Sequence, residues 1–347
     1  MLNTTKNLIA YLKQPRDQRS GLVVSAWVNA IITCGTTDDA DALLPLFLNN
    51  PSDFDHSYLL TVIKYLGTST HAKELYHRCI NQHRLAEGMP EEILEVLGRL
   101  QFLPARPMLI QYALGTDGGT SYSHSQYAVL GLLHMDCSGY ESQIAEAIRK
   151  CYGQNLFPEF VPALVCKLPD RNDYLAPLYE LGNEQASTDC NAGIILGISL
   201  CGEPGKKYFK QILFNPNWET FSGGTGTAHA TYQALKNLGI TFQEMYTDIK
   251  AGKTCEQPGD ALKVLFALIG ERLTDYKGGH TESFIDLYHL FFKWKNGYES
   301  DNLVDLAGKF NLADSAYELE QALIMKITEE AIVNNIRDMA ATGKVKR

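Results

Sequence analysis

The sequence lacks the features of a membrane-spanning protein. Its longest apolar stretch, from Gly21 to Gly35, is 15 residues long and includes Ser25 and Asn29. A helix that crosses a bilayer needs about 20 apolar residues. The N-terminal stretch contains no long apolar region followed by a small-residue cleavage site, so it does not resemble a secretory signal. We therefore expect a protein that is not embedded in a membrane.

Positive charge is also scarce. The chain has 31 Lys and Arg against 40 Asp and Glu, a formal net charge of -9. Neutralising a nucleic-acid backbone needs clustered basic residues, and no basic stripe is present, so we do not expect a nucleic-acid partner. From Glu299 to Glu330, eight carboxylates stand against two lysines. This segment is expected either to be a solvated capping surface or to attract a basic partner.

Cysteine pairs and catalytic motifs are missing. Eight cysteines are scattered without a Cys-x-x-Cys pair, which favours free thiols in a reducing cytoplasm. His71, His77 and His83 are spaced six apart, unlike the pair four residues apart that holds a metal on one helical face. No P-loop, dinucleotide fingerprint or Gly-x-Ser-x-Gly elbow occurs. We therefore expect no metal site and no cofactor.

What the chain does contain is a repeat. Its clearest copy, from His124 to Gly153, has an apolar helix, a tight polar turn and an amphipathic second helix. The first helix of each copy ends at one of these aligned positions: Gly35, Gly67, Gln101, His134, Pro169, Gly202 and Gly239. They are separated by 32, 34, 33, 35, 33 and 37 residues. A two-helix period of this length is typical of an α-solenoid, in which stacked neighbours bury a continuous core.

The pattern resembles the HEAT-like repeat families over Leu22–Lys250. The Thr-Pro-Leu-His motif of ankyrin repeats and the Trp and Tyr positions of tetratricopeptide repeats are absent. The resemblance implies an all-α fold, an α-solenoid of about seven two-helix repeats with helical caps. Residues 22–252 would form the array, 1–21 an N-terminal cap and 253–347 a C-terminal cap.

Polar residues open several of the apolar helices, which would line the concave surface of such an array. Three openings contain a His followed two or three residues later by a Tyr. The candidate binding residues are Asp55, His56, Tyr58, His124, Tyr127, Asp189, Asn191, His229 and Tyr232. If the repeats stack in register, these groups converge on one ligand or partner segment. Helix capping is the alternative explanation, because Ser, Thr, Asp and Asn are the usual N-caps.

Three further features are candidates of a different kind. Trp218 lies in the longest irregular segment and is expected to be an exposed anchor for a partner. His280 follows a glycine-rich opening whose backbone N–H groups could hold an anion, although a flexible loop is the favoured interpretation. Glu91, Glu92 and Glu95 fit an acidic first helical turn, not an acid/base pair.

The leading hypothesis is a non-catalytic protein-binding solenoid that holds a basic partner on its concave face or acidic end. Some bacterial HEAT-like solenoids of this size are immunity proteins beside polymorphic toxins. The alternative is a small-molecule enzyme with a site built from His56, His124, Asp189, His229 and nearby tyrosines. HEAT-like folds include DNA glycosylases and phycobilin lyase subunits, but this chain lacks the basic groove of the first and any motif of the second. Side chains meeting in one closed pocket would favour an enzyme.

Overall fold

The computed structural model describes residues 1–250 except 52, 116–120, 155–156, 185–190 and 219–224. This part of the chain is mostly helical, which confirms the all-α class. The expected C-terminal cap at 253–347, with its acidic segment and His280, lies outside the described residues, as does Asp189. No helix within the described ranges is long and apolar enough to cross a membrane.

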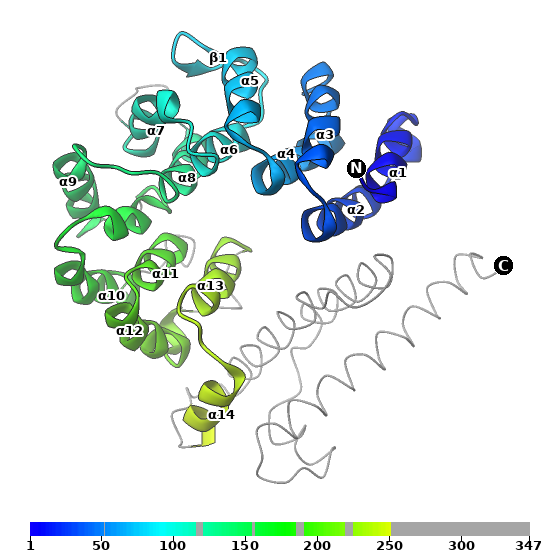
Figure 1. Ribbon diagram of the computed structural model, residues 1–347. Coiled ribbons are helices and arrows are strands. Elements are labelled where there is room, and N and C mark those ends of the chain that lie inside the picture. The colour runs from blue at the N-terminus through cyan, green and yellow to red at the C-terminus, as the bar shows by residue number, and fades with distance from the viewer. Residues whose placement is uncertain (52, 116–120, 155–156, 185–190, 219–224, 251–347) are drawn as a thin grey trace, which may run out of the picture.

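The helices alternate between two rows in Figure 1. The inner row comprises α2 (Gly21–Cys34), α4 (Phe54–Leu66), α6 (Glu92–Arg99), α8 (Tyr122–Leu132), the 3₁₀ helix η3 (Val161–Lys167), α11 (Asn191–Leu200) and α13 (Thr225–Asn237). Each member of this row contacts the next one along the chain. The inner row therefore corresponds to the helices that the sequence repeat defines.

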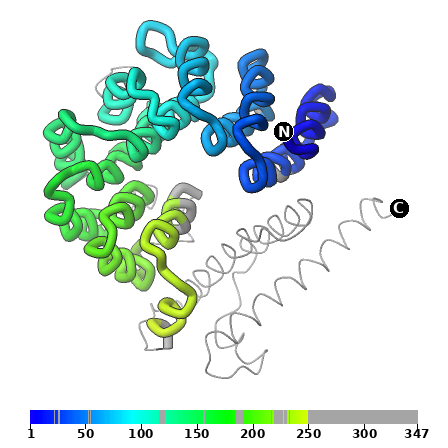
Figure 2. Tube along the Cα trace, viewed as in Figure 1, coloured from blue at the N-terminus to red at the C-terminus, as the bar shows by residue number. Residues whose placement is uncertain are grey.

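The outer row covers the inner row on its convex side (Figure 1). It comprises α1 (Asn3–Leu12), α3 (Thr37–Asn49), α5 (Ser69–Cys79), α7 (Arg106–Ala113), α9 (Glu141–Cys151), α10 (Leu175–Glu184), α12 (Glu203–Leu213) and α14 (Phe242–Lys250). Short 3₁₀ helices join the rows: η1 (Arg16–Gln18), η2 (Leu103–Ala105), η4 (Arg171–Tyr174) and η6 (Pro216–Trp218). Figure 2 shows that the described chain follows an open arc from α1 to α14.

One continuous apolar core runs between the two rows. It includes Leu8 and Leu12 of α1, which lie against α2 and α3. The N-terminal segment expected to be a cap thus shares the core of the helices that follow. One helix pair cannot bury its apolar face alone, so neighbouring pairs share a core.

Glycines let some inner helices approach each other backbone to backbone. A Cβ atom added at Gly98 of α6 would lie 2.3 Å from the carbonyl carbon of Gly131 in α8. Likewise, a Cβ at Gly193 of α11 would lie 2.1 Å from the carbonyl oxygen of Glu159, which precedes η3. Real Cβ atoms essentially never come this close. The inner row is therefore held together more tightly than side-chain packing would allow, which accounts for the curvature of the arc in Figure 1.

Polar side chains connect each helix pair to the next. The bonded residues are separated by about one repeat: Arg99 Nη1 and His134 Nε2 are 35 residues apart, and Asn237 Nδ2 donates to Ser199 Oγ 38 residues before it. Lys210 of α12 similarly pairs with Asp248 of α14, at 2.8 Å and 38 residues apart. The sequence period is thus also the period of the contacts.

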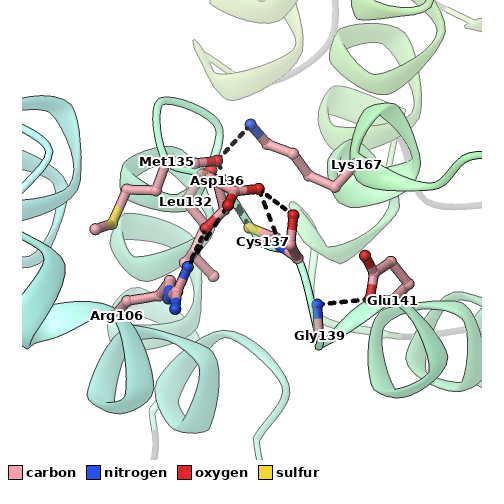
Figure 3. A network of polar contacts seen from close by, with 9 residues as sticks. Arg106, Leu132, Met135, Asp136, Cys137, Gly139, Glu141 and Lys167 are labelled. Carbon is pink, nitrogen blue, oxygen red and sulfur yellow. Dashed lines mark hydrogen bonds and ion pairs between the residues drawn. The ribbon is translucent and has the colours of Figure 1, made fainter.

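The turn between α8 and α9 is held from both sides, as Figure 3 shows. Lys167 at the end of η3 donates from Nζ to the carbonyl oxygens of Leu133 and Met135, both at 2.8 Å. Arg106 of α7 donates from Nη1 to the carbonyl oxygen of Asp136 at 3.0 Å. The two cations thus supply donors to turn carbonyls at and beyond the C-cap of α8.

The structure differs from the sequence expectation in two elements. A hairpin of β1 (Ile80–Asn81) and β2 (Arg84–Leu85), which an all-α expectation does not include, follows α5. Its turn residues Gln82 and His83 both have positive φ, a turn geometry usually signalled by glycine, which is absent here. The segment ending at Pro169 forms the 3₁₀ helix η3 instead of an α-helix. Pro169 forces Leu168 into an extended conformation, which ends this element.

Candidate functional site

Asp55 and His56 are part of a buried structural cluster. They retain 6% and 5% of their surface exposed. Arg19, which precedes α2, places Nη2 at 2.8 Å from Asp53 and Nε at 3.3 Å from Asp55. Asp53 also caps α4 by accepting the N–H of Asp55 at 2.9 Å. These residues attach the N-terminal helices to α4, so Asp55 and His56 are not available to bind a ligand or partner.

The same cluster determines the charge state of His56. Burial lowers the pKa of His56 below its usual value, with the positive charge of Arg19 acting in the same direction and Asp53 opposing it. Within the described residues Nδ1 of His56 has no hydrogen-bond partner. A neutral, enclosed imidazole is therefore part of the native structure near pH 7.

His124 and Tyr127 point in different directions from α8. The His124 ring stacks on Tyr112 of α7 with centroids 5.1 Å apart, and its Nδ1 contacts Oγ of the N-cap residue Ser121. Ser121 caps α8 by accepting the backbone N–H of His124, and the His124 ring packs against the outer row. Tyr127 instead donates from its hydroxyl to Oε1 of Glu92 on α6, at 3.2 Å. Of the two, only Tyr127 contacts a neighbouring inner helix.

Trp218 is fully buried, so the expectation of an exposed anchor is wrong. Its ring stacks on Tyr179 of α10 at 5.7 Å. A Cβ at Gly182 would lie 2.1 Å from the indole, which shows how closely the ring covers that helix. The loop after Asn215 folds its aromatic residue back onto α10 and α12 because burying a large aromatic ring stabilises the core.

The remaining predicted residues do not form a common site. Asn191, the first residue of α11, is fully buried, and both polar atoms of its side chain lack a partner in the described part of the chain. The side chains of His229 and Tyr232, in α13, lie outside what the structure describes. No described contact joins Asp55, His124 or Asn191 to another predicted site residue of a different helix. The convergence expected from the sequence is not found among them.

A depression of about 260 Å³ lies between the inner helices α4 and α6. It is lined by Ser57, Tyr58, Leu60, Thr61, Lys64, Glu92, Glu95 and Val96. The predicted residue Tyr58 is therefore part of it. Leu60 and Val96 provide a buried apolar floor, and the other members provide hydroxyls, one ammonium group and two carboxylates.

The carboxylates of α6 are oriented by the helices on both sides. Lys64 of α4 places Nζ at 2.9 Å from Oε1 of Glu95. From α8, Tyr127 donates to Glu92 as described, and the Ser123 hydroxyl donates to Oε1 of Glu91 at 3.2 Å. Three carboxylates are thus fixed in the inner row by contacts about one repeat away.

Two of these carboxylates keep an uncompensated charge. In the part of the chain that the structure describes, Glu95 pairs with Lys64, whereas neither Glu91 nor Glu92 pairs with a cation. Burial and the adjacent negative charge of Glu92 raise the pKa of Tyr127 well above its usual value. The tyrosine therefore remains protonated and acts as a donor to Glu92, which stays free to accept from a ligand through its other oxygen.

The groups around the apolar floor of this depression are charged or able to form hydrogen bonds. No group of His, Cys, Asp and Glu side chains within the described residues could hold a metal ion. A second depression, of about 470 Å³, lies between α7, α9 and η3, and no predicted site residue lines it. The α4–α6 depression is therefore taken as the candidate site, because the predicted residue Tyr58 lines it.

Comparison with known proteins gave no match to a family model, to a curated protein or to a solved structure.

The sequence interpretation missed the carboxylates of α6 as site residues. It expected Glu91, Glu92 and Glu95 to form an acidic first helical turn; Glu92 and Glu95 do lie in the first turn of α6, and Glu91 is its N-cap. The signal that could have identified them is the repeat period, because Tyr127 follows Glu92 by 35 residues and Glu95 follows Lys64 by 31. Residues one period apart occupy neighbouring helices of the same row, where their side chains can meet.

Proposed function

We propose that this chain is a HEAT-like α-solenoid that binds a basic protein partner on its inner row of helices and catalyses no reaction there. The observation that carries the proposal is the pair Glu91 and Glu92, two carboxylates that side chains of α8 hold in place and that pair with no cation in the described ranges. Fixed negative charge favours a basic partner and accelerates its association. The net charge of -9 acts in the same direction.

The solenoid part of the proposal is supported by the alternation of inner and outer helices and by contacts spaced one repeat apart. Each pair contributes to one continuous core and leaves an inner surface that runs past several repeats. Repeat arrays of this kind offer extended surfaces that suit a protein partner better than a small substrate. An immunity or inhibitor role follows from the resemblance to HEAT-like immunity proteins, whose partners are toxin domains.

The alternative, a small-molecule enzyme, loses support from the placement of its proposed residues. His56 is enclosed by the Arg19 cluster and His124 packs against α7, so neither lines a common pocket with the other. Asp189 and the side chain of His229 lie outside the described residues. Enzyme sites depend on convergent groups in a concave pocket, and the described members do not converge.

The test is capture of the partner by the tagged full-length chain in its native host cells. The wild type is compared with the double variant Glu91→Gln/Glu92→Gln. The matched control is Glu74→Gln/Glu87→Gln, which removes the same charge from exposed positions on α5 and the loop after β2. We expect one stoichiometric, basic protein that the inner-row variant loses and the control keeps. A further variant with the carboxylates of 299–330 neutralised asks whether the acidic end takes part.

Two outcomes contradict the proposal. A partner that binds all variants equally is not held by the inner row, even if it is basic. Recovery of a small molecule in place of a protein would favour the enzyme hypothesis, above all if the variants His124→Ala and His229→Ala release that molecule. Binding in 100 mM and 500 mM salt separates a charge-dependent complex from an apolar one, since screening weakens only the former.

A further inference from the structure

The α4–α6 depression combines an apolar floor with an anionic rim, and this combination narrows the ligand class. Leu60 and Val96 at its base are 2% and 1% exposed. Glu92 and Glu95 stand at its edge. We infer that the depression accepts an arginine side chain of the partner, with the guanidinium on Glu92. This inference rests on the proposed function and specifies the chemistry of its contact.

The apolar floor favours a ligand that carries its charge at the end of a hydrocarbon stem. Arginine and lysine side chains bury their methylene groups against apolar surfaces and keep the charged group at the edge. A metal ion or a small inorganic cation would leave Leu60 and Val96 without a contact. The hydroxyls of Ser57 and Thr61, on the α4 side, add polar groups around such a stem.

The two carboxylates at the rim differ in their need for a cation. Lys64 already supplies an ammonium to Glu95 at 2.9 Å, so the charge of Glu95 is balanced within the chain. Glu92 accepts only the neutral hydroxyl of Tyr127, through Oε1. Its other oxygen has no partner among the described residues. The unbalanced charge of the depression is therefore that of Glu92.

A guanidinium suits this position better than an ammonium. It is planar and weakly hydrated, which lowers the cost of placing it in a partly enclosed site, and its donors match carboxylate oxygens. It also stacks on aromatic rings. The inner row already contains such a pair within the chain, since the Arg99 guanidinium lies 4.3 Å from the ring centre of Tyr65. An aromatic residue, Tyr58, is also part of the lining of the depression.

The experiment uses the full-length chain and N-acetyl-arginine amide as the probe, followed by saturation-transfer NMR and a titration of its signals. N-acetyl-citrulline amide, of nearly the same shape but uncharged, is the ligand control. The protein variants are Glu92→Gln, whose amide oxygen can still accept from Tyr127, and Glu74→Gln as a control for the loss of one charge. Thermal unfolding followed by circular dichroism checks that both variants fold as the wild type does.

We expect the arginine probe to bind the wild type and the Glu74→Gln variant equally, and to bind Glu92→Gln at least five-fold more weakly. The citrulline probe should give no saturable signal. Equal binding of arginine to wild type and Glu92→Gln would overturn the inference, as would equal binding of citrulline. Spermidine or Mg²⁺ that binds through Glu92 while the arginine probe does not would also overturn it, in favour of a free cation.

Failure of this inference can be told apart from failure of the proposed function. A native protein partner that is lost on the Glu91→Gln/Glu92→Gln change, together with an arginine probe that does not depend on Glu92, leaves the binding function in place and removes the arginine contact. If the arginine probe binds at Glu92 but the chain captures no protein partner, the arginine site stands and the proposed protein-binding function fails.

Discussion

Replacing Gly98 with alanine tests the closest contact of the inner row. The added methyl carbon would lie 2.3 Å from the carbonyl carbon of Gly131 and 2.4 Å from its Cα and oxygen. Carbon atoms normally pack at about 3.5–4.0 Å, so α8 must move away from α6 by about 1 Å. The obstacle is backbone, which cannot rotate aside as a side chain could.

The magnitude follows from two opposing effects. Overpacking a close contact costs about 1–3 kcal/mol. Alanine is a better helix former than glycine by up to about 1 kcal/mol, which offsets part of that cost. Because three backbone atoms are met at once, we place the steric cost at the upper end and expect a net loss of about 2 kcal/mol. The midpoint of thermal unfolding should then fall by about 3–4 °C, because a chain of this length has a large unfolding entropy.

The assay is thermal unfolding of the full-length protein, followed by circular dichroism at 222 nm. Gly21→Ala is the matched control, because a Cβ at this helical position would meet only the Tyr58 hydroxyl, at an ordinary 3.7 Å. The control should be unchanged or slightly more stable. If Gly98→Ala proves as stable as Gly21→Ala, the two inner helices are not in backbone contact, and the explanation given for the curvature of the arc fails.

Three further predictions concern the polar contacts that hold the repeats together. Lys167→Met keeps the apolar stem but removes the hydrogen bonds to Leu133 and Met135, so urea unfolding should show a loss of about 1.5–3 kcal/mol in the free energy of unfolding. Its control is Lys150→Met, which breaks only an exposed ion pair on α9 and should change this free energy by less than about 0.5 kcal/mol. Arg19→Met leaves two carboxylates unpaired at the start of α4 and should cost about 3–5 kcal/mol in the same measurement, and a loss as small as that of Lys150→Met would contradict the role given to this cluster. The pKa of His56 in the folded protein lies below the value of 6.5 expected for the unfolded chain, so the contribution of His56 to stability is complete above pH 6.5 and declines as the pH falls below it. The unfolding midpoint should therefore drop less between pH 7.5 and 5.5 in His56→Gln than in the wild type. Equal drops would show that His56 does not titrate as its burial requires.

The all-α class and the order of the helices were predictable because they depend on local information. The aligned ends Gln101, Gly202 and Gly239 are residues with positive φ, the conformation that terminates many helices, and glycine signals it in two of the three. Apolar spacing then indicated which helices would be buried. The link between Asp53, the N-cap of α4, and Arg19 could not be predicted in this way, because Arg19 lies 34 residues earlier.

The candidate site was less predictable because it depends on pairs of residues from different helices. Polar residues at the start of α4 looked like an exposed ridge, yet Arg19 makes Asp55 and His56 interior. From the sequence, Glu92 was an ordinary first-turn carboxylate. The structure shows that it accepts a hydrogen bond from Tyr127, which lies 35 residues later in the chain. Residue type alone does not distinguish a buried ion pair from a binding surface. The partner one repeat away does.

The location of the depression has a cause in the sequence that connects packing with recognition. Three residues before their aligned ends, α6 and α8 carry Gly98 and Gly131, which bring these two helices into backbone contact. The corresponding residue of α4 is Lys64, whose side chain extends to Glu95 of α6. α4 therefore lacks, at this position, the glycine that lets α6 and α8 approach so closely. On its α8 side, α6 has its carboxylates oriented by Ser123 and Tyr127. On its α4 side, α6 borders the depression, which has space for a ligand.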